Sequence, residues 1–395
     1  MDKLEKLKLL GESAKYDVCA SSSARPKKFL DAAIGQTVPS GVCHSFTPDG
    51  RCVSLFKVLL SNQCEKDCFY CPNRSARDVP RSRFEPEELA GLFMEFYRRN
   101  YVEGLFLSSG VHHSTNRTMQ ELLDTLEILR YRYRFGGYIH LKILPGAGEA
   151  ETEKAVELAN RVSLNMEAPS ATYLSRLSRT KNFASEIMGG MSRIHRQVIR
   201  QPGVSHSTQF IIGAARESDQ DILNSAVRLY KGYGLKRAYF SAFQPVPGTP
   251  LENVAGAPLI REHRLYQADF LFRYYGYAME ELAFDPAGNL DLEMDPKQAF
   301  ALRHPELFPL EINRASLAEL LRIPGIGPRS ARKIVSLRRE GAFRTVEELS
   351  RIGVVTRRAL PFMLVQGKGY SAPVHLAAAR NRKPCIQQSL WGDYS

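Results

Sequence analysis

The chain has 395 residues, 44% of them hydrophobic and 24% charged, which is an ordinary composition for a folded protein with one large and one small domain. Its first residues mix Lys and Glu with Leu, which argues against a secretory signal peptide. No stretch is apolar enough to span a bilayer. We therefore expect a cytoplasmic protein without a membrane partner. The net charge of +12 is uneven, because residues 311–395 carry 15 Lys and Arg against 6 Asp and Glu, which favours an anionic polymer as partner of the C-terminal part.

Short apolar runs alternate with amphipathic segments between residues 53 and 248. The strand candidates are 53–63, 104–108, 138–144, 162–166, 207–212 and 237–243. The helix candidates between them are 86–99, 118–134, 151–161, 185–200 and 219–233. Apolar runs separated by helices predict a parallel α/β sheet with right-handed crossovers. We therefore predict a partial (β/α)6 TIM-like barrel whose chemistry lies at the C-terminal ends of its strands.

The domain organisation follows from these patterns. We expect residues 1–52 to form an N-terminal extension packed on the barrel, which itself spans residues 53–284. Residues 285–310 contain four prolines and are expected to form an irregular connector. A small all-α domain at residues 311–368 and a polar tail at residues 369–395 complete the chain.

Three cysteines are crowded into eight residues directly after the first predicted strand. Cys64, Cys68 and Cys71 have the spacing Cys-x3-Cys-x2-Cys, which lets one short loop supply thiolates to three irons of a [4Fe–4S] cluster. The fourth iron has no protein ligand nearby in sequence and could chelate the methionine part of S-adenosylmethionine (SAM). A structural zinc site is the alternative, although zinc usually takes four ligands in paired groups.

The cysteine motif resembles that of the radical SAM superfamily, including the aromatic Tyr70 before the third cysteine. The resemblance implies reductive cleavage of SAM and a cofactor pocket along the strand ends. The implied cofactor-binding residues are Tyr70, Ser108, Ser109, Gly110, Asn165, Glu167, Gly213 and Gln244. The segment after the second strand departs from the family pattern, because it lacks the acidic residue that receives the SAM amino group.

Other residues in the barrel region leave alternatives open. Cys19, Cys43 and Cys52 could hold a second cluster, but their spacing is wide and free cysteines are often simply buried. His112 and His113 follow the implied SAM segment and are candidate catalytic proton donors or acceptors. Exposed loop histidines without a catalytic role are the alternative.

A glycine-rich turn between two helices marks the C-terminal domain. Pro324 ends the first helix, and Gly325, Ile326 and Gly327 form a turn beside the N-terminus of the second, where backbone N–H groups favour a phosphate oxygen. The sequence resembles the helix-hairpin-helix module of DNA-binding proteins. The implied DNA-binding residues are Gly325, Ile326, Gly327, Arg329, Arg332 and Lys333. A second hairpin at residues 351–357 lacks one glycine and is either a packing partner or a further phosphate contact.

The polar tail contains a short pattern at residues 385–391 that resembles sliding-clamp-binding peptides. A disordered tail without a partner is the alternative.

The full architecture resembles a family of prokaryotic radical SAM proteins assigned to DNA modification or repair and associated with a uracil-DNA-glycosylase-like protein. The resemblance implies DNA base modification or lesion repair, that partner, and an electron donor such as flavodoxin or ferredoxin. Two alternatives remain open: a radical SAM enzyme that modifies RNA, and a non-catalytic iron–sulfur protein that binds or recruits to DNA.

Overall fold

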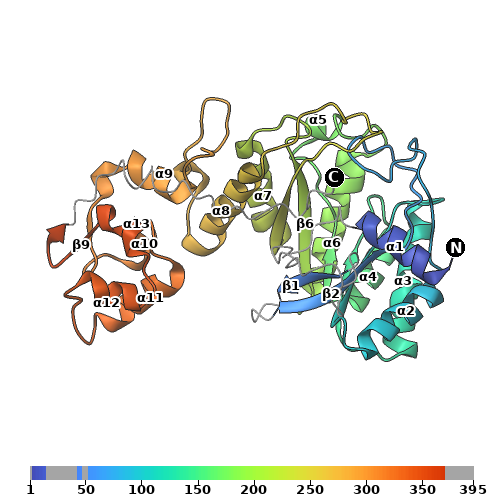
Figure 1. The fold of residues 1–395 in the computed structure, drawn as a ribbon, viewed down its shortest axis with the longest axis horizontal. Helices are drawn as coiled ribbons and strands as arrows, with labels where there is room; N and C mark the ends of the chain where they lie inside the picture. Colours follow the sequence, from blue (N-terminus) through green and yellow to red (C-terminus); the bar gives the residue numbers. More distant parts are fainter. Residues whose placement is uncertain (1, 15–41, 47–51, 370–395) are drawn as a thin grey trace, which may run out of the picture. The chain divides into compact units, whose positions relative to one another are not determined.

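The computed structural model describes residues 2–14, 42–46 and 52–369. Within these ranges the chain forms two compact units, of which the first comprises residues up to 217 with 225–257 and the second comprises residues 218–224 and 258–369. The first unit contains the large sheet and the second contains the C-terminal helices (Figure 1). No helix in the described ranges has the length and apolar content needed to cross a membrane.

Seven strands form the large sheet and lie in chain order. They are β1 (Val42–Phe46), β2 (Cys52–Leu59), β3 (Gly104–Ser108), β4 (Tyr138–Lys142), β5 (Arg161–Ser163), β6 (Ser205–Ile212) and β7 (Arg237–Ala242). Strands β2 to β7 run parallel to one another, which gives a six-stranded half-barrel. The predicted partial α/β barrel is therefore confirmed.

Strand β1 was not expected from its sequence. It pairs antiparallel with β2, and Val42 lies opposite Phe56 in the register. The signal that could have revealed it is the Asp49-Gly50 pair between two runs that suit strands, because such a dipeptide favours a hairpin.

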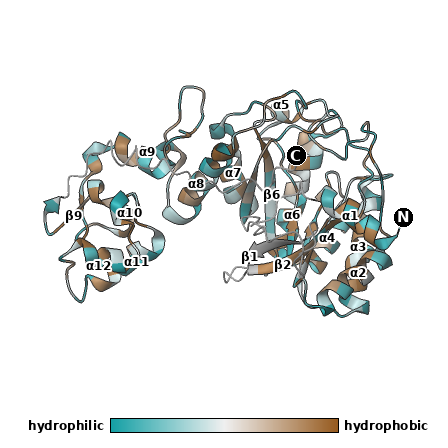
Figure 2. Ribbon diagram, viewed as in Figure 1, coloured by the Kyte–Doolittle hydropathy of each residue, from teal (hydrophilic) through white to brown (hydrophobic). Residues whose placement is uncertain are grey.

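Helices alternate with the strands along the chain, and Figure 2 shows that they carry both hydrophobic and hydrophilic residues. They are α1 (Lys3–Ser13), α2 (Pro86–Arg98), α3 (Thr115–Glu127), α4 (Glu149–Leu158), α5 (Ala171–Leu174), α6 (Gly189–Arg200) and α7 (Asp219–Tyr233). In α2, Pro86 occupies the first turn, where its missing N–H costs nothing, and Leu89 and Phe93 lie four residues apart on the buried face. The Phe93 ring lies 6.2 Å from that of Phe56 on β2, so the helix is fixed against the sheet.

Two of the predicted helices are less regular than their sequences suggest. The helix predicted at 118–134 ends in a π-helical turn, Ile128–Arg132. The helix predicted at 185–200 begins in a second π-helical turn, Phe183–Met188. Hydrophobic periodicity does not distinguish these turns from an ordinary helix, because each differs by one residue in its hydrogen-bond spacing.

The second unit combines short helices with a small sheet. Its helices are α8 (Leu259–Tyr275), α9 (Pro296–Arg303), α10 (Leu317–Leu320), α11 (Pro328–Leu337), α12 (Val346–Arg351) and α13 (Thr356–Ala359). Its sheet has the order β10 (Lys368–Gly369), β9 (Met363–Val365) and β8 (Leu310–Glu311). Ile312, Leu320, Ile334 and Met363 are fully buried in its core.

Helix α9 lies in the stretch that was expected to be irregular. Pro296 stands in the first turn of α9, and the Asp295 side chain caps the helix by accepting a hydrogen bond from the Gln298 N–H at 3.2 Å. Proline at this position starts a helix instead of breaking one, which is why a count of prolines misjudged the segment.

Candidate functional site

A cavity of about 330 Å³ lies at the C-terminal ends of the barrel strands. Leu59, Ser108, Lys142, Gln209 and Ser241 each bring a side chain to it from a different strand. Alternate residues of a strand face the same side, so the last inward-facing residues of parallel strands meet at one edge. This is the edge at which the sequence predicted the chemistry.

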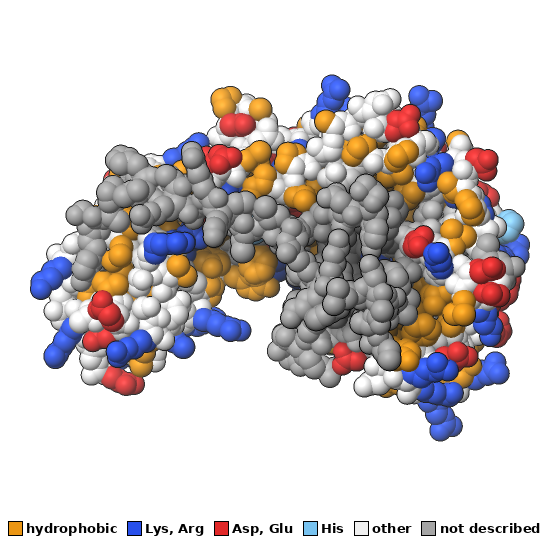
Figure 3. Space-filling view, viewed as in Figure 1, with side chains coloured by type: hydrophobic (Ala, Val, Ile, Leu, Met, Phe, Trp, Pro, Cys, Tyr) orange, Lys and Arg blue, Asp and Glu red, His pale blue; other side chains and the backbone are white. Residues whose placement is uncertain are grey.

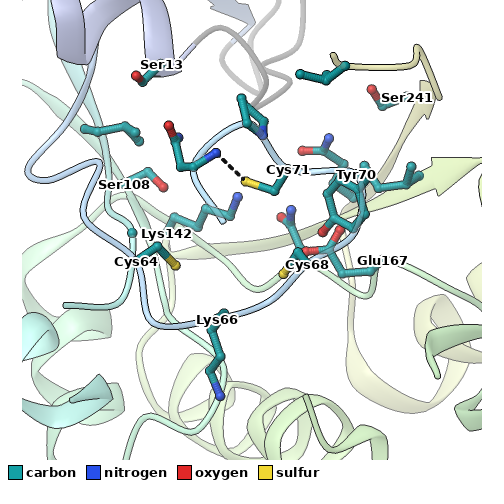
Figure 4. Close-up of a pocket in the computed structure, with 18 of the residues that line it drawn as sticks. Ser13, Cys64, Lys66, Cys68, Tyr70, Cys71, Ser108, Lys142, Glu167 and Ser241 are labelled. Atoms are coloured by element: carbon teal, nitrogen blue, oxygen red, sulfur yellow. Dashed lines mark hydrogen bonds between the residues drawn. The ribbon is translucent and has the colours of Figure 1, made fainter. Parts of the chain in front are cut away.

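Cys64, Cys68 and Cys71 all line this cavity as free thiols (Figure 4). The Asn73 N–H donates a hydrogen bond to the Cys71 sulfur at 3.4 Å. Among the described residues, no three His, Cys, Asp or Glu side chains surround a point that one metal ion could occupy.

The Arg81 side chain holds the loop that carries the cysteines. One guanidinium nitrogen donates to the carbonyls of Asn62 and Asn73, at 2.6 and 2.9 Å. The other donates to the carbonyls of Arg74 and Arg77, both at 2.8 Å. Four carbonyls from both ends of the loop thus converge on one planar cation, which fixes the path of the chain around the three thiols.

The opposite side of the same loop is attached to residues 178–186. The Asp67 carboxylate accepts hydrogen bonds from the hydroxyls of Ser178 and Thr180, at 2.6 and 2.8 Å. Burial acts to raise the pKa of Asp67, but these hydrogen bonds outweigh it and lower the pKa to about 2. Lys66 forms an ion pair with Glu186 at 2.9 Å, which adds a second attachment.

A buried ion pair forms one wall of the cavity. The Lys181 ammonium donates to the Glu167 carboxylate at 3.0 Å, and the two side chains are only 8% and 5% exposed. Burial acts to lower the pKa of Lys181, but the negative charges of Cys68 and Glu167 outweigh it and raise the pKa above its usual value. Lys181 therefore stays charged beside the cysteine loop, where a positive charge favours a thiolate.

Burial raises the pKa of the Cys68 and Cys71 thiols above the ordinary value for cysteine. Neighbouring cysteines raise it further, because a second thiolate repels the first. Binding of a cluster to these thiolates would therefore have to outweigh the cost of their burial.

The cavity also fits a ligand beside a cluster. The Glu167 carboxylate and the Tyr70 hydroxyl lie together on its wall, where both can contact a ligand. Gly110 lies against the cysteine loop so closely that an added Cβ would stand 2.3 Å from the Gln63 carbonyl oxygen. Only glycine leaves room there for the loop and the strand end together.

Most of the predicted cofactor-binding residues are found together. Those that line the cavity are Tyr70, Ser108, Ser109, Gly110, Asn165, Glu167 and Gln244. Gly213 does not line it; its φ is +92°, and its N–H donates to Glu217 at 2.5 Å. This glycine therefore shapes the turn after β6.

The two candidate catalytic histidines do not line the cavity either. His112 is 2% exposed, and its ring lies 2.8 Å from the Glu121 carboxylate. The His113 side chain is exposed, and its φ of +58° marks a tight turn. Both lie just beyond the strand end, so the structure brings neither to the group of cavity residues.

Several cavity residues were not anticipated, among them Lys66, Asn73, Lys142 and Lys181. Lys142 could have been found, because it has the inward-facing parity at the end of a predicted strand. Lys181 lies in a segment without periodicity or motif, so no sequence signal indicated it.

The C-terminal unit contains the predicted glycine-rich turn. Gly325 has a φ of +88°, and an added Cβ would lie 2.5 Å from the Val355 carbonyl oxygen, so both conformation and space require glycine. Gly327 caps α11, and Arg329, Arg332 and Lys333 are exposed along that helix. Several Lys and Arg side chains project from the visible surface of this unit (Figure 3).

The second hairpin, formed by α12 and α13, packs against the first. Gly353 has a φ of +94° at its turn, and the Val355 N–H donates to the Gly325 carbonyl at 2.9 Å. It is thus a packing partner of the first hairpin. The Arg357 side chain remains exposed.

Some sequence predictions fall outside the described residues. They concern the side chains of Cys19, Cys43 and Cys52 as ligands of a second cluster, and the clamp-like pattern at 385–391.

Two family matches accord with these two regions. Residues 58–229 match the radical SAM superfamily, and residues 309–360 match the helix-hairpin-helix motif.

Curated relatives match the barrel part of the chain. The tRNA-2-methylthio-N(6)-dimethylallyladenosine synthase of Janthinobacterium sp. (strain Marseille) is 24% identical over 208 residues, which cover 50% of this chain and 45% of that protein. The 7,8-didemethyl-8-hydroxy-5-deazariboflavin synthase of Methanosarcina barkeri (strain Fusaro / DSM 804) is 26% identical over 217 residues, covering 52% and 65%. The chain thus spans about half the length of the curated relatives it matches.

Solved structures show weaker likenesses. Methylornithine synthase (PylB) aligns with a TM-score of 0.43 and 17% identity, covering 53% of this chain and 59% of that one. The FeFe-hydrogenase maturase HydG from Carboxydothermus hydrogenoformans aligns with a TM-score of 0.45 and 16% identity, covering 76% and 70%. The barrel region at residues 58–229 is thus a radical SAM domain, and the chain carries a C-terminal helix-hairpin-helix motif.

Proposed function

We propose that this radical SAM enzyme acts on nucleic acid, with DNA base modification or lesion repair as its reaction. The observation that carries the proposal is the presence, in one chain, of a cavity lined by three thiols and a helix-hairpin-helix motif with exposed basic residues. A phosphate-binding module attached to a radical generator is useful only if the substrate is a phosphate polymer.

The radical SAM domain implies a [4Fe–4S] cluster and SAM. Cys64, Cys68 and Cys71 would hold the cluster, and Ser108, Asn165 and the other polar residues of the cavity would contact SAM. When bound, these groups supply radical chemistry by one-electron cleavage of a carbon–sulfur bond. The electrons require a donor such as flavodoxin or ferredoxin.

The chain's own residues would prepare the cavity for these groups. Arg81 and Asp67 fix the cysteine loop from two sides. The Lys181 ammonium adds positive charge beside the thiolates, and the Glu167 carboxylate and the Tyr70 hydroxyl would be polar partners for a ligand. Most of the cavity surface is apolar, so a closed site would exclude water from the radical.

In the C-terminal unit, the Gly327 N–H and the other free N–H groups at the N-terminus of α11 would bind a phosphate oxygen. Arg329, Arg332 and Lys333 would add long-range attraction to the polymer. A base in a duplex would have to leave the stack to reach the cavity, at a cost of a few kcal/mol that is lower at damaged or single-stranded sites.

RNA is the second candidate substrate. The observation that favours it is the 24% identity over 208 residues with a synthase whose name describes a tRNA modification. Phosphate contacts alone do not separate RNA from DNA, which requires contact with the 2′-hydroxyl.

The test is a set of anaerobic incubations of reconstituted, reduced protein with SAM and with matched DNA or RNA. We expect 5′-deoxyadenosine to form and one polymer to yield a new nucleoside in mass spectrometry. The matched control is Cys68→Ala, which should yield neither product. SAM cleavage with unchanged nucleosides across natural and damaged DNA and RNA would refute a nucleic-acid substrate. Cluster-dependent DNA binding without 5′-deoxyadenosine would instead identify a non-catalytic binding protein.

A uracil-DNA-glycosylase-like protein and, through the tail, a sliding clamp are the further partners we propose. Co-purification of the full chain with each candidate tests them, because repair enzymes that hand over a lesion form such contacts.

A further inference from the structure

A buried lysine lies directly behind the glycine-rich turn of the first hairpin. Lys297 belongs to α9, outside the matched helix-hairpin-helix residues 309–360. Its side chain is buried, and its ammonium donates a hydrogen bond to the Ile326 carbonyl oxygen at 2.5 Å. The turn is therefore held from behind by a residue that the motif does not include.

This hydrogen bond sets the direction of the next N–H group. In a trans peptide the C=O and N–H bonds point in opposite directions. Because the Ile326 carbonyl points at Lys297, the Gly327 N–H must point away from it. Among the residues that the structure describes, none accepts a hydrogen bond from this N–H. The group is thus left available for an external acceptor at the start of α11.

The charged and titratable groups around Lys297 come from every element packed on it. The Tyr275 ring of α8 lies 4.7 Å from the ammonium. Asp295 caps α9 and forms an ion pair with Arg358 of α13, while Arg322, after α10, pairs with Glu281 at 2.7 Å. Burial is the main cause that lowers the pKa of Lys297; Arg358 and Arg322 lower it further, Asp295 opposes them, and the result is about 7.

We propose that Lys297 is a positioning residue for phosphate binding: it orients the Gly327 N–H toward the ligand and places a positive charge behind the turn. The inference rests on the proposed function, because it requires the turn to bind the phosphate of a nucleic acid. An anion in front of the turn and an ammonium behind it attract each other across a low-dielectric region.

The two contributions of Lys297 respond differently to pH. A neutral amine still donates a hydrogen bond, so the carbonyl remains held when the proton is lost. Only the charge disappears as pH rises through the pKa. Bound phosphate favours the charged form, so binding is tighter below the pKa of the free protein and weakens above it, and binding near this pH takes up protons.

The experiment measures the affinity of the full-length protein for a fluorescent 20-base-pair duplex at constant salt, at pH 6.0 and 8.5. For the wild type we expect binding to weaken by roughly five- to tenfold over this range. Lys297→Met should bind weakly at both pH values with a flat profile. Lys297→Arg, which keeps its charge, should bind tightly at pH 8.5. Circular dichroism confirms that each variant folds.

Calorimetry of the wild type in buffers of different ionisation enthalpy provides a readout that needs no variant. We expect proton uptake on duplex binding near pH 7.5. Wild-type binding with no proton uptake, or the same pH dependence in Lys297→Met as in the wild type, would overturn the role of Lys297 while leaving nucleic-acid binding intact. Absence of binding to DNA and RNA at every pH would overturn the proposed function as well.

Discussion

The barrel and the C-terminal unit each bury a lysine next to their functional motif, but the two environments shift its pKa in opposite directions. Lys181 faces a carboxylate and the cysteine thiols, which raise its pKa. Lys297 is buried near two arginines, and its pKa is lowered to about 7. The first lysine is a fixed charge and the second one titrates near neutral pH. Both lysines are buried, so the comparison teaches that the charged neighbours decide the direction in which the pKa of a buried lysine shifts.

The two motifs also differ in how they present themselves to a ligand. The barrel motif lines a cavity and depends on buried ion pairs and loop contacts. The hairpin motif exposes its basic side chains and backbone donors on a small helical unit with a core of its own. We therefore expect substitutions in the barrel to abolish chemistry, and substitutions in the hairpin to weaken binding by degrees.

The largest effect is expected for Cys68→Ala. A cluster held by three thiolates loses one of its ligands, so cluster absorbance and SAM cleavage should be lost. Duplex binding should stay within about twofold of the wild type, because the hairpin surface is unchanged. Cys19→Ala, outside the three-cysteine loop, is the matched control and should retain the cluster. If Cys68→Ala abolished duplex binding too, the two regions would not be independent.

The second prediction concerns Lys181→Met. Removing one partner of a buried pair leaves the Glu167 carboxylate uncompensated, which should lower the free energy of unfolding by about 3–5 kcal/mol. Urea titration of the anaerobic holoprotein, followed by circular dichroism, measures it. The double variant Lys181→Met, Glu167→Gln should recover part of the loss, because it removes the stranded charge. A loss below about 1 kcal/mol in the single variant would show that the pair is solvated.

The third prediction uses pH to test how far the barrel depends on buried groups. Burial, reinforced by the charge of His195, lowers the pKa of His206 from 6.5 to about 3. Both ring nitrogens of His206 are buried and make no hydrogen bond within the described residues. Below pH 6.5 the unfolded state binds a proton that the folded state does not, so stability should fall by about 1.4 kcal/mol per pH unit. The contribution of His206 to stability should be fully present above pH 6.5.

Urea titrations at pH 7 and pH 5 measure this dependence. His206→Gln should remove about 2 kcal/mol of the difference between the two pH values. His140 is a second buried histidine whose pKa is lowered by burial. The pH dependence of stability that His140 contributes should remain in the His206→Gln variant. An unchanged pH dependence in His206→Gln would mean that His206 is already protonated in the fold.

The sequence predicted the features that a short motif or a strict period encodes. The six parallel strands follow from apolar runs, and the Cys64, Cys68 and Cys71 loop and the Gly325–Gly327 turn follow from spacing. It missed Arg81 and Lys181, whose roles arise from contacts between loops that follow no motif and no period. A lone basic residue in a loop carries no local signal of what its side chain will meet.

The smallest effect is expected for the double variant Arg332→Gln, Lys333→Gln in α11. Both side chains are exposed, so their removal should leave the fold intact and reduce only the long-range attraction to phosphate. The slope of log affinity against log salt should fall by up to about two, one for each phosphate that the variant no longer neutralises, and binding in low salt should weaken roughly tenfold. Anisotropy titrations from low to moderate salt measure this.

Arg338→Gln is not a suitable control, because Arg338 donates to the Ile312 and Ala315 carbonyls. Arg339→Gln, just beyond the C-terminal end of α11, removes one charge farther from the turn and should alter the slope by less than half as much. Equal effects per charge removed would mean that the polymer senses the net charge of the unit and does not lie at the turn.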